Sequence, residues 1–170
     1  MRNFWRNFMK SQCNIRATTK EDIDTIYFFI QEIARYEKLE NQVIATKEKL
    51  LESIFIKKQA EVFLLEIEQK AIGFIIIYEH FSSFIGQSGI YLEDIFILKE
   101  YRNFGYGKQA LVFIAQLGVQ RNVHRIEWSV LNWNEPSIAF YKSINAIAMD
   151  EWTTFRLEKD EIVNLANQTM

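Results

Sequence analysis

Residues 91–110 read YLEDIFILKEYRNFGYGKQA, and this stretch decides the fold that we expect. Its first eight residues are mostly Ile, Leu, Phe and Tyr, which is typical of a strand. A glycine-rich loop follows at 102–107, and apolar residues then recur at helical spacing to about residue 122. Such a loop offers backbone amides and the positive end of a helix, so it is a candidate anion site that fits a pyrophosphate.

Patterns on both sides of this stretch predict a mixed α/β order. Runs of β-branched and aromatic residues predict strands at 13–16, 61–67, 71–79, 88–98, 125–131 and 152–157. Helical spacing predicts a helix from residue 23 after a cap at Thr19, and a shorter one after Thr46. Further helices are expected at 107–122, 137–144 and 160–166. We expect one domain at 12–170 after an extension at 1–11, in which Met9 is an alternative start.

Composition excludes several classes of protein. The chain has 170 residues, of which 49% are hydrophobic and 15% aromatic, and this suits one compact domain. Twenty Lys and Arg against 22 Asp and Glu give no basic excess, which argues against a nucleic-acid partner. One cysteine and two histidines predict no disulfide framework and no metal site. No apolar run reaches the ~20 residues of a membrane helix and no signal peptide is evident, so a cytoplasmic protein without a membrane partner is expected.

Two other stretches carry candidate chemistry. Glu93 and Asp94 are adjacent in a strand, and since neighbouring strand residues point to opposite faces, only one of them is expected to face a given cleft. A carboxylate in such an apolar strand is costly unless it has a partner. The segment 133–142 reads WNEPSIAFYK, in which Asn134 or Ser137 can cap a helix that carries Tyr141.

A dinucleotide site is the competing interpretation of the loop. Residues 105–110 satisfy the G-x-G-x-x-G/A fingerprint, and Glu127 lies 20 residues after Gly107. Six residues, Arg102 among them, separate Leu98 from Gly105, however, and too few residues follow for the rest of a dinucleotide-binding fold. We therefore favour a different phosphate-binding fold.

Together these segments resemble the GNAT superfamily of acetyl-CoA-dependent N-acetyltransferases, in which an R-x-x-G-x-G loop follows the fourth strand. The resemblance is closest to its diamine acetyltransferase group, which acts on spermidine and spermine, and it runs from about residue 14 to 166. The signatures that carry it are ARYE at 34–37, YLED at 91–94, RNFGYG at 102–107 and WNEPSIAFYK at 133–142. The chain departs from that group at Ser143, Ile144 and Asn145.

The resemblance implies a twisted, mostly antiparallel sheet of about seven strands, with helices on both faces and a V-shaped splay between strands 4 and 5. It implies acetyl-CoA as cosubstrate, a polyamine or diamine as substrate, and a homodimer. Tyr141 would be the general acid and Glu93 the base, and Tyr36, Glu37 and Glu93 would contact the amine. The residues that would bind the cofactor are Ile95, Phe96, Ile97, Arg102, Asn103, Phe104, Gly105, Tyr106, Gly107, Lys108, Asn134, Glu135, Pro136 and Ser137.

The expected reaction is direct attack of a neutral amine on the thioester in a ternary complex, with Glu93 as proton acceptor and Tyr141 as proton donor. A thialysine-like amino acid or another small amine is the alternative substrate, because the thialysine acetyltransferases share much of this pattern. A catalytically inactive acetyl-CoA-binding module is a further alternative.

Overall fold

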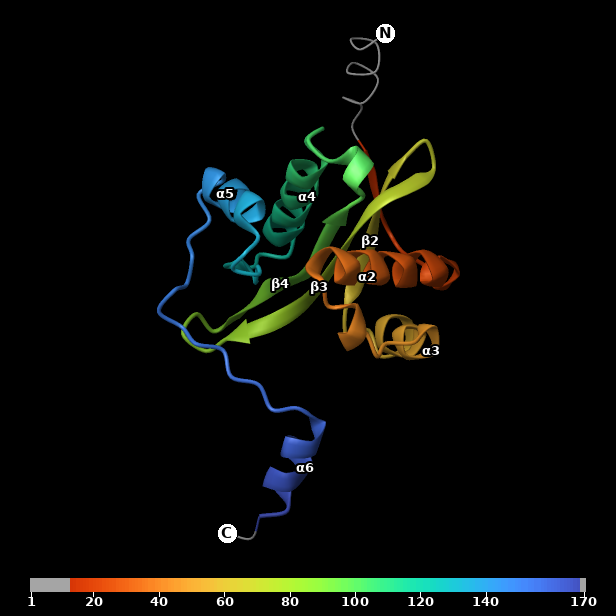
Figure 1. Ribbon diagram of the computed structural model, residues 1–170. Coiled ribbons are helices and arrows are strands. Elements are labelled where there is room, and N and C mark those ends of the chain that lie inside the picture. The colour runs from red at the N-terminus through yellow and green to blue at the C-terminus, as the bar shows by residue number, and fades with distance from the viewer. Residues whose placement is uncertain (1–12, 169–170) are drawn as a thin grey trace. The chain divides into compact units, whose positions relative to one another are not determined.

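The computed structural model describes residues 13–168 (Figure 1), so the proposed extension at 1–11, with Met9, lies outside the described residues. The chain divides into two compact units, one ending at Leu131 and the other beginning at Asn132. The boundaries of a single domain at 12–170 stay a prediction.

The first unit is built on a five-stranded sheet in the order β1-β2-β3-β4-β5. β1 to β4 pair antiparallel, whereas β4 and β5 pair parallel. The mixed α/β fold with a mostly antiparallel sheet is therefore confirmed, and the mostly parallel sheet of a dinucleotide-binding fold is absent from the described part of the chain. The strands are β1 (Asn14–Ala17), β2 (Glu61–Ile67), β3 (Lys70–Ser82), β4 (Gln87–Ile97) and β5 (Ile126–Trp128).

The expected number of strands, about seven, is wrong for residues 13–168, where five form. The strand expected at 152–157 does not form, because a strand needs a hydrogen-bonded neighbour and this segment pairs with none of the described strands. Its large side chains are exposed, with Trp152 at 73% and Phe155 at 90%. The strand expected at 125–131 is confined to Ile126–Trp128.

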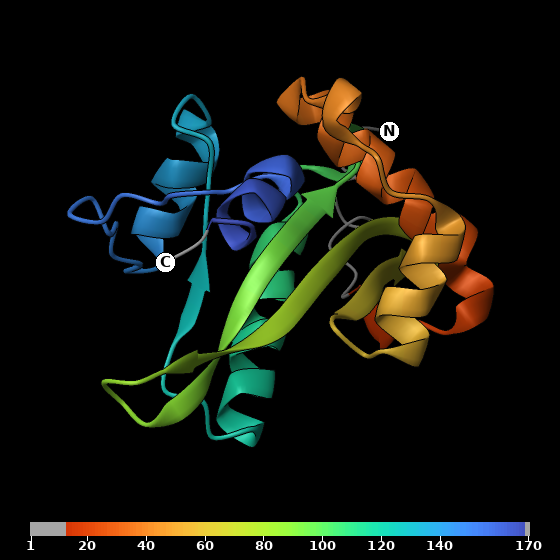
Figure 2. The ribbon, with the colours of Figure 1, turned by 90° about the horizontal axis from the view of Figure 1, so that it is seen from below.

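Helices cover both faces of the sheet, as expected. On one face α2 (Ile23–Glu37) packs so that Phe29 stacks on Phe74 of β3, with ring centroids 5.3 Å apart. On the other face α4 (Tyr106–Gln120) places Phe113 edge-on against Phe63 of β2 at 4.9 Å. Figure 2 shows the sheet between α4 and the pair formed by α2 and α3 (Lys47–Leu50), which continues as a π-helical segment at Leu51–Ile56.

The predicted caps explain where the first helices begin. The Asp22 carboxylate accepts a hydrogen bond from the Thr19 amide at 2.8 Å, and it also pairs with Arg16 of β1. Thr46 accepts a hydrogen bond from the Lys49 amide at 3.3 Å and so starts α3. The α2 helix ends at Lys38 in the left-handed conformation, which leaves Tyr36 and Glu37 in its last turn.

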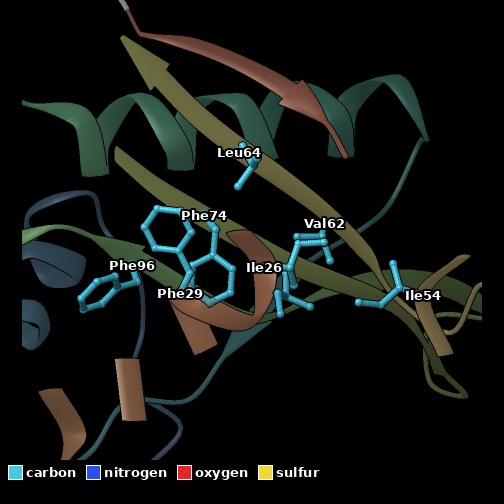
Figure 3. Packing of buried hydrophobic residues seen from close by; sticks show 8 residues of the cluster. Ile26, Phe29, Ile54, Val62, Leu64, Phe74 and Phe96 are labelled. Carbon is cyan, nitrogen blue, oxygen red and sulfur yellow. The ribbon is translucent and has the colours of Figure 1, made fainter. Parts of the chain in front are cut away.

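The main core lies between α2, α3 and the sheet (Figure 3). Phe29 and Phe74 meet at its centre, and each is fully buried. Burial of such side chains contributes about 25 cal/mol for each Å² of apolar surface, which makes this cluster the main anchor of α2. The cluster consists of Ile26, Phe29, Ile54, Val62, Leu64, Phe74, Ile76 and Phe96.

Two irregularities of β4 shape the region after Leu92. Ile76 pairs with Asp94 and Ile77 with Leu92, so Glu93 is the extra residue of a β-bulge. The parallel pairing with β5 covers only residues 90–92 of β4, and its last pair joins Leu92 to Trp128. From Glu93 to Ile97 the strand therefore has β3 as its partner but not β5, which is the expected splay between strands 4 and 5.

The second unit contains α5 (Glu135–Ser143) and α6 (Lys159–Ala166). Asn134 caps α5 by accepting a hydrogen bond from the Ser137 amide at 3.4 Å, and Pro136 lies in the first turn, as expected. Asn145 follows α5 in the left-handed conformation, with φ of 64°. None of the helices found between residues 13 and 168 is long and apolar enough to span a membrane.

The stacked pair at the core centre gives a test of this packing. Phe74→Ala is expected to lower the free energy of unfolding by about 3–5 kcal/mol, because it removes a fully buried ring and leaves a cavity under α2. Urea denaturation measures the change. The matched control is Phe84→Ala, since Phe84 is 95% exposed and its loss should cost less than about 0.5 kcal/mol. Equal effects of the two substitutions would contradict the packing described.

Candidate active site

Three carboxyl groups, those of Glu37, Glu93 and Asp94, interact electrostatically in the region of the β4 bulge and the last turn of α2. Asp94 shares a sheet face with Ile76 and Phe96, because its pairing with Ile76 places it on the side that α2 covers. Glu93 is exposed at the bulge and Glu37 is partly buried. No lysine or arginine within residues 13–168 forms an ion pair with any of the three groups, which we call the carboxyl cluster.

This crowding perturbs the titration of Asp94. Burial raises the pKa of Asp94 from 3.8 to about 7, and the negative charges of Glu93 and Glu37 add to the rise. Burial also raises the pKa of Glu37. No described lysine or arginine therefore neutralises the negative charge of the cluster. A cation bound there would offset both the cost of burying that charge and the repulsion between the carboxylates.

Sequence reasoning did not single out Asp94. The alternation of a regular strand allowed only one of Glu93 and Asp94 to face a given cleft, and the family resemblance selected Glu93. The bulge interrupts this alternation and places both residues on the side of the sheet that α2 covers. The available signal was the adjacent pair of acids in an otherwise apolar strand. Tyr36, Glu37 and Glu93, which were predicted to contact one amine, do lie in the same region of the first unit.

The glycine-rich loop has the geometry expected of an anion site. Asn103 and Gly105 are both left-handed, with φ of 66° and 90°, and Gly105 caps the N-terminus of α4. The side chain of Tyr106 is buried and fixes the loop between its two glycines. A Cβ atom added at Gly105 or Gly107 would meet nothing within 4 Å, so open space lies beside the helix N-terminus. A pyrophosphate fits such a position.

Arg102 has a different environment from the rest of that loop. Its Nε donates a hydrogen bond to the Ile97 carbonyl at 2.8 Å. Its guanidinium lies 4.4 Å from the ring centroid of Tyr36 and 5.1 Å from that of Phe96. The side chain thus reaches from the loop to the end of β4 and the end of α2.

The predicted residues of β4 occupy the splayed part of the strand. Ile95 and Ile97 lie beyond the last pair with β5, and the ring of Phe96 is buried in the core. Nearer the start of β4, Tyr91 stacks on its β3 partner Tyr78, with ring centroids 5.0 Å apart. The hydroxyl groups of Tyr91 and Ser129 are 2.7 Å apart, which links β4 to the residues just after β5.

The remaining predicted residues belong to the second unit. Asn134 is buried and caps α5, whereas Glu135 and Pro136 are exposed in its first turn. Tyr141 is partly buried near the end of the same helix. Residues 134–137 and Tyr141 thus belong to α5 and its cap, in the second unit. The carboxyl cluster and the glycine-rich loop belong to the first unit.

The structure also describes the side chains that could bind a metal ion or react as a thiol. No group of three or more His, Cys, Asp or Glu side chains in this part could hold a metal ion. Cys13 is buried, and burial raises the pKa of its thiol, so the reactive thiolate is disfavoured.

Comparison with known proteins identifies related sequences. The profile of the acetyltransferase (GNAT) family matches residues 21–145. A thialysine N-ε-acetyltransferase of Sus scrofa is 30% identical, over 91% of this chain and 97% of the relative. An L-ornithine N5-acetyltransferase of Arabidopsis thaliana is 27% identical, over 87% of this chain and 85% of the relative.

The fold has counterparts among solved structures. An integron cassette protein of Vibrio cholerae matches with a TM-score of 0.77 and 24% identity, over 93% of this chain and 99% of its own. This likeness shows that the two chains share a fold.

The titration of Asp94 predicts a pH-dependent change in stability. Between pH 4 and 7 the folded chain holds a proton on Asp94 that the unfolded chain releases, so the contribution of this group to stability falls as pH rises. Asp94→Asn removes this dependence. We expect the variant to gain stability relative to wild type as pH rises from 4 to 8, by at most about 4 kcal/mol.

Urea denaturation of both proteins across this pH range measures the difference. Asp150→Asn is the matched control, because Asp150 is exposed, and its difference from wild type should stay near zero at every pH. A constant difference for Asp94→Asn would show that Asp94 titrates normally in the folded chain.

Proposed function

Because this chain belongs to the acetyltransferase (GNAT) family, we propose that it transfers the acetyl group of acetyl-CoA to a primary amine of a diamine or polyamine. The observation that supports this substrate is the carboxyl cluster of Glu37, Glu93 and Asp94, which no described cation neutralises. A molecule with two or more ammonium groups and no negative charge complements such a site best.

Acetyl-CoA supplies an activated acetyl group as a thioester. The open space beside Gly105 and Gly107 fits its pyrophosphate, and the backbone amides of residues 103–108 would hold that group at the N-terminus of α4. Lys108, which is exposed, adds a positive charge there. Ile95 and Ile97 would bind the pantetheine arm through backbone groups of the splayed part of β4. Residues 134–137 would line the cofactor from the start of α5.

The amine must lose a proton before it attacks. An alkyl ammonium with a pKa near 10.4 is only roughly 0.1% neutral at physiological pH, which is a handicap of roughly 4 kcal/mol. Glu93 is exposed at the bulge, where it can accept this proton directly or through water. Glu37 and Asp94 then hold the positive charge that remains on a second nitrogen.

The transfer forms a nitrogen–carbon bond and breaks the carbon–sulfur bond of the thioester. The departing thiolate gains a proton from the hydroxyl of Tyr141, which we assign as general acid. The attacking nitrogen loses two protons in all. The first goes to Glu93 before the attack, and the second leaves as the tetrahedral adduct collapses and restores the Tyr141 hydroxyl, so the products are a neutral amide and a free thiol. The reaction needs no metal ion and no covalent bond to the chain.

A basic amino acid is the second candidate substrate. The relatives from Sus scrofa and Arabidopsis thaliana are named for thialysine and ornithine, each of which carries an α-carboxylate besides its amines. The carboxyl cluster would repel that carboxylate, and for this reason we favour the diamine.

We further propose a cytoplasmic homodimer. Large apolar side chains of the second unit are exposed in the single chain, and a second copy would cover them. They include Trp152, Phe155, Leu157, Ile162, Val163 and Leu165.

The cofactor assignment predicts the effect of filling the open space of the loop. Gly107→Val should weaken acetyl-CoA binding at least tenfold, because the new side chain occupies the position assigned to the pyrophosphate. It should leave the melting temperature nearly unchanged, since a Cβ at this position meets no neighbour within 4 Å. Calorimetry and thermal denaturation give the two values. Undiminished binding by the variant, or preferred binding of a nicotinamide dinucleotide, would overturn the assignment.

The substrate assignment is tested by a pair of amines that differ in one group. Putrescine is ornithine without the α-carboxylate, so the ratio of their kcat/KM values reports the effect of that charge alone. We expect kcat/KM for putrescine and spermidine to be at least ten times that for ornithine and thialysine. This ratio should fall as the salt concentration rises. Glu37→Gln should raise KM for putrescine about tenfold and narrow the preference.

The opposite preference would reject the diamine and leave the acetyltransferase assignment intact. If ornithine or thialysine reacts at least ten times more efficiently than putrescine and spermidine, the substrate is a basic amino acid. Absence of transfer to every amine would support the inactive acetyl-CoA-binding module instead.

A further inference from the structure

Arg102 joins three parts of the first unit that the proposed reaction uses. It begins the glycine-rich loop, its Nε bonds the Ile97 carbonyl at the end of β4, and its guanidinium lies over Tyr36 in the last turn of α2. The guanidinium is closer to the Tyr36 ring, at 4.4 Å, than to the Phe96 ring, at 5.1 Å. The rings of Tyr36 and Phe96 are themselves in edge contact at 6.2 Å.

These contacts need the chemistry of arginine. A planar guanidinium stacks on an aromatic face and still directs a donor to a carbonyl in its own plane. Lysine has one compact ammonium on a flexible stem and cannot make both contacts in the same way. The side chain therefore acts here through its shape as much as through its charge.

Arg102 contacts α2 at its last turn, through the ring of Tyr36. The helix ends at Glu37, and the amides of its left-handed cap Lys38 and of Leu39 donate hydrogen bonds to the Arg35 and Ala34 carbonyls, which fixes the backbone of this turn. The ring of Tyr36 lies against side chains from outside the helix. Phe96 is buried and belongs to the core cluster, so it is a fixed surface for this end of the helix. Arg102 packs on Tyr36 and on that fixed surface together.

We propose that Arg102 is a positioning residue for the amine site, which holds Tyr36 and hence Glu37 at a set place relative to the glycine-rich loop. The inference rests on the proposed function, because it concerns the amine that this function requires. It separates Arg102 from the other residues of its loop: they bind the cofactor through backbone amides, whereas Arg102 acts through Tyr36. Loss of the stacking should therefore impair amine binding more than cofactor binding.

The substitution Arg102→Lys tests this role, because it keeps the positive charge and removes the planar group. We expect KM for putrescine to rise about tenfold, and the Kd of acetyl-CoA from calorimetry to stay within twofold of wild type. Arg121→Lys is the matched control. Arg121 makes a two-pronged ion pair with Glu61 at 2.5 and 2.7 Å, so the control loses an arginine contact outside the site and should leave both constants unchanged.

A double-mutant cycle with Tyr36→Leu separates positioning from direct phosphate binding. If Arg102 acts through Tyr36, adding Arg102→Lys to Tyr36→Leu should raise KM for putrescine less than twofold further. Additive effects on KM, or an acetyl-CoA Kd weakened at least tenfold in Arg102→Lys, would overturn the proposal and make Arg102 a phosphate contact.

Urea denaturation of the wild type, the two single variants and the double variant tests the contact between Arg102 and Tyr36 without any substrate. Non-additive changes in stability support the stacking of Arg102 on Tyr36, and additive changes contradict it. A wild-type chain that acetylates no amine contradicts the proposed function, whereas the unfolding cycle still decides whether Arg102 and Tyr36 act together.

Discussion

The loss of pairing between β4 and β5 after Leu92 is the constraint on which the rest of the site depends. A sheet that stayed paired to Ile97 would satisfy the backbone groups of β4 and leave no opening for a ligand. The bulge at Glu93 coincides with the point where the pairing ends, and it turns two adjacent carboxyls toward the side that α2 covers. The loop that follows β4 then delivers the N-terminus of α4 to the same end of the sheet.

Much of this arrangement could be predicted from local sequence. The caps at Thr19 and Thr46 and the left-handed Asn145 follow from side-chain hydrogen bonding and turn geometry, which act within a few residues. The anion loop could be predicted for the same reason, because its glycines and the helix after them are contiguous. The structure gives these elements nearly the expected bounds.

Features that depend on distant partners could not be predicted in this way. The raised pKa of Asp94 requires a bulge opposite Ile76 and a helix end that brings Glu37 near. The position of Arg102 requires Tyr36, which lies 66 residues earlier in the chain. The pattern at 152–157 has the composition of a strand, but a strand forms only where another edge accepts its hydrogen bonds, and no local pattern reports that.

The central claim is that an amine binds as a cation beside Asp94. Calorimetry of putrescine binding to the complex with CoA, in buffers of different ionisation enthalpy, counts the protons exchanged. Because the pKa of Asp94 is about 7, a cation should drive its deprotonation and release about half a proton per site at pH 7, falling toward zero at pH 9. The Asp94→Asn variant should release almost none. Binding without proton release in wild type, or with equal release in the variant, would contradict the account.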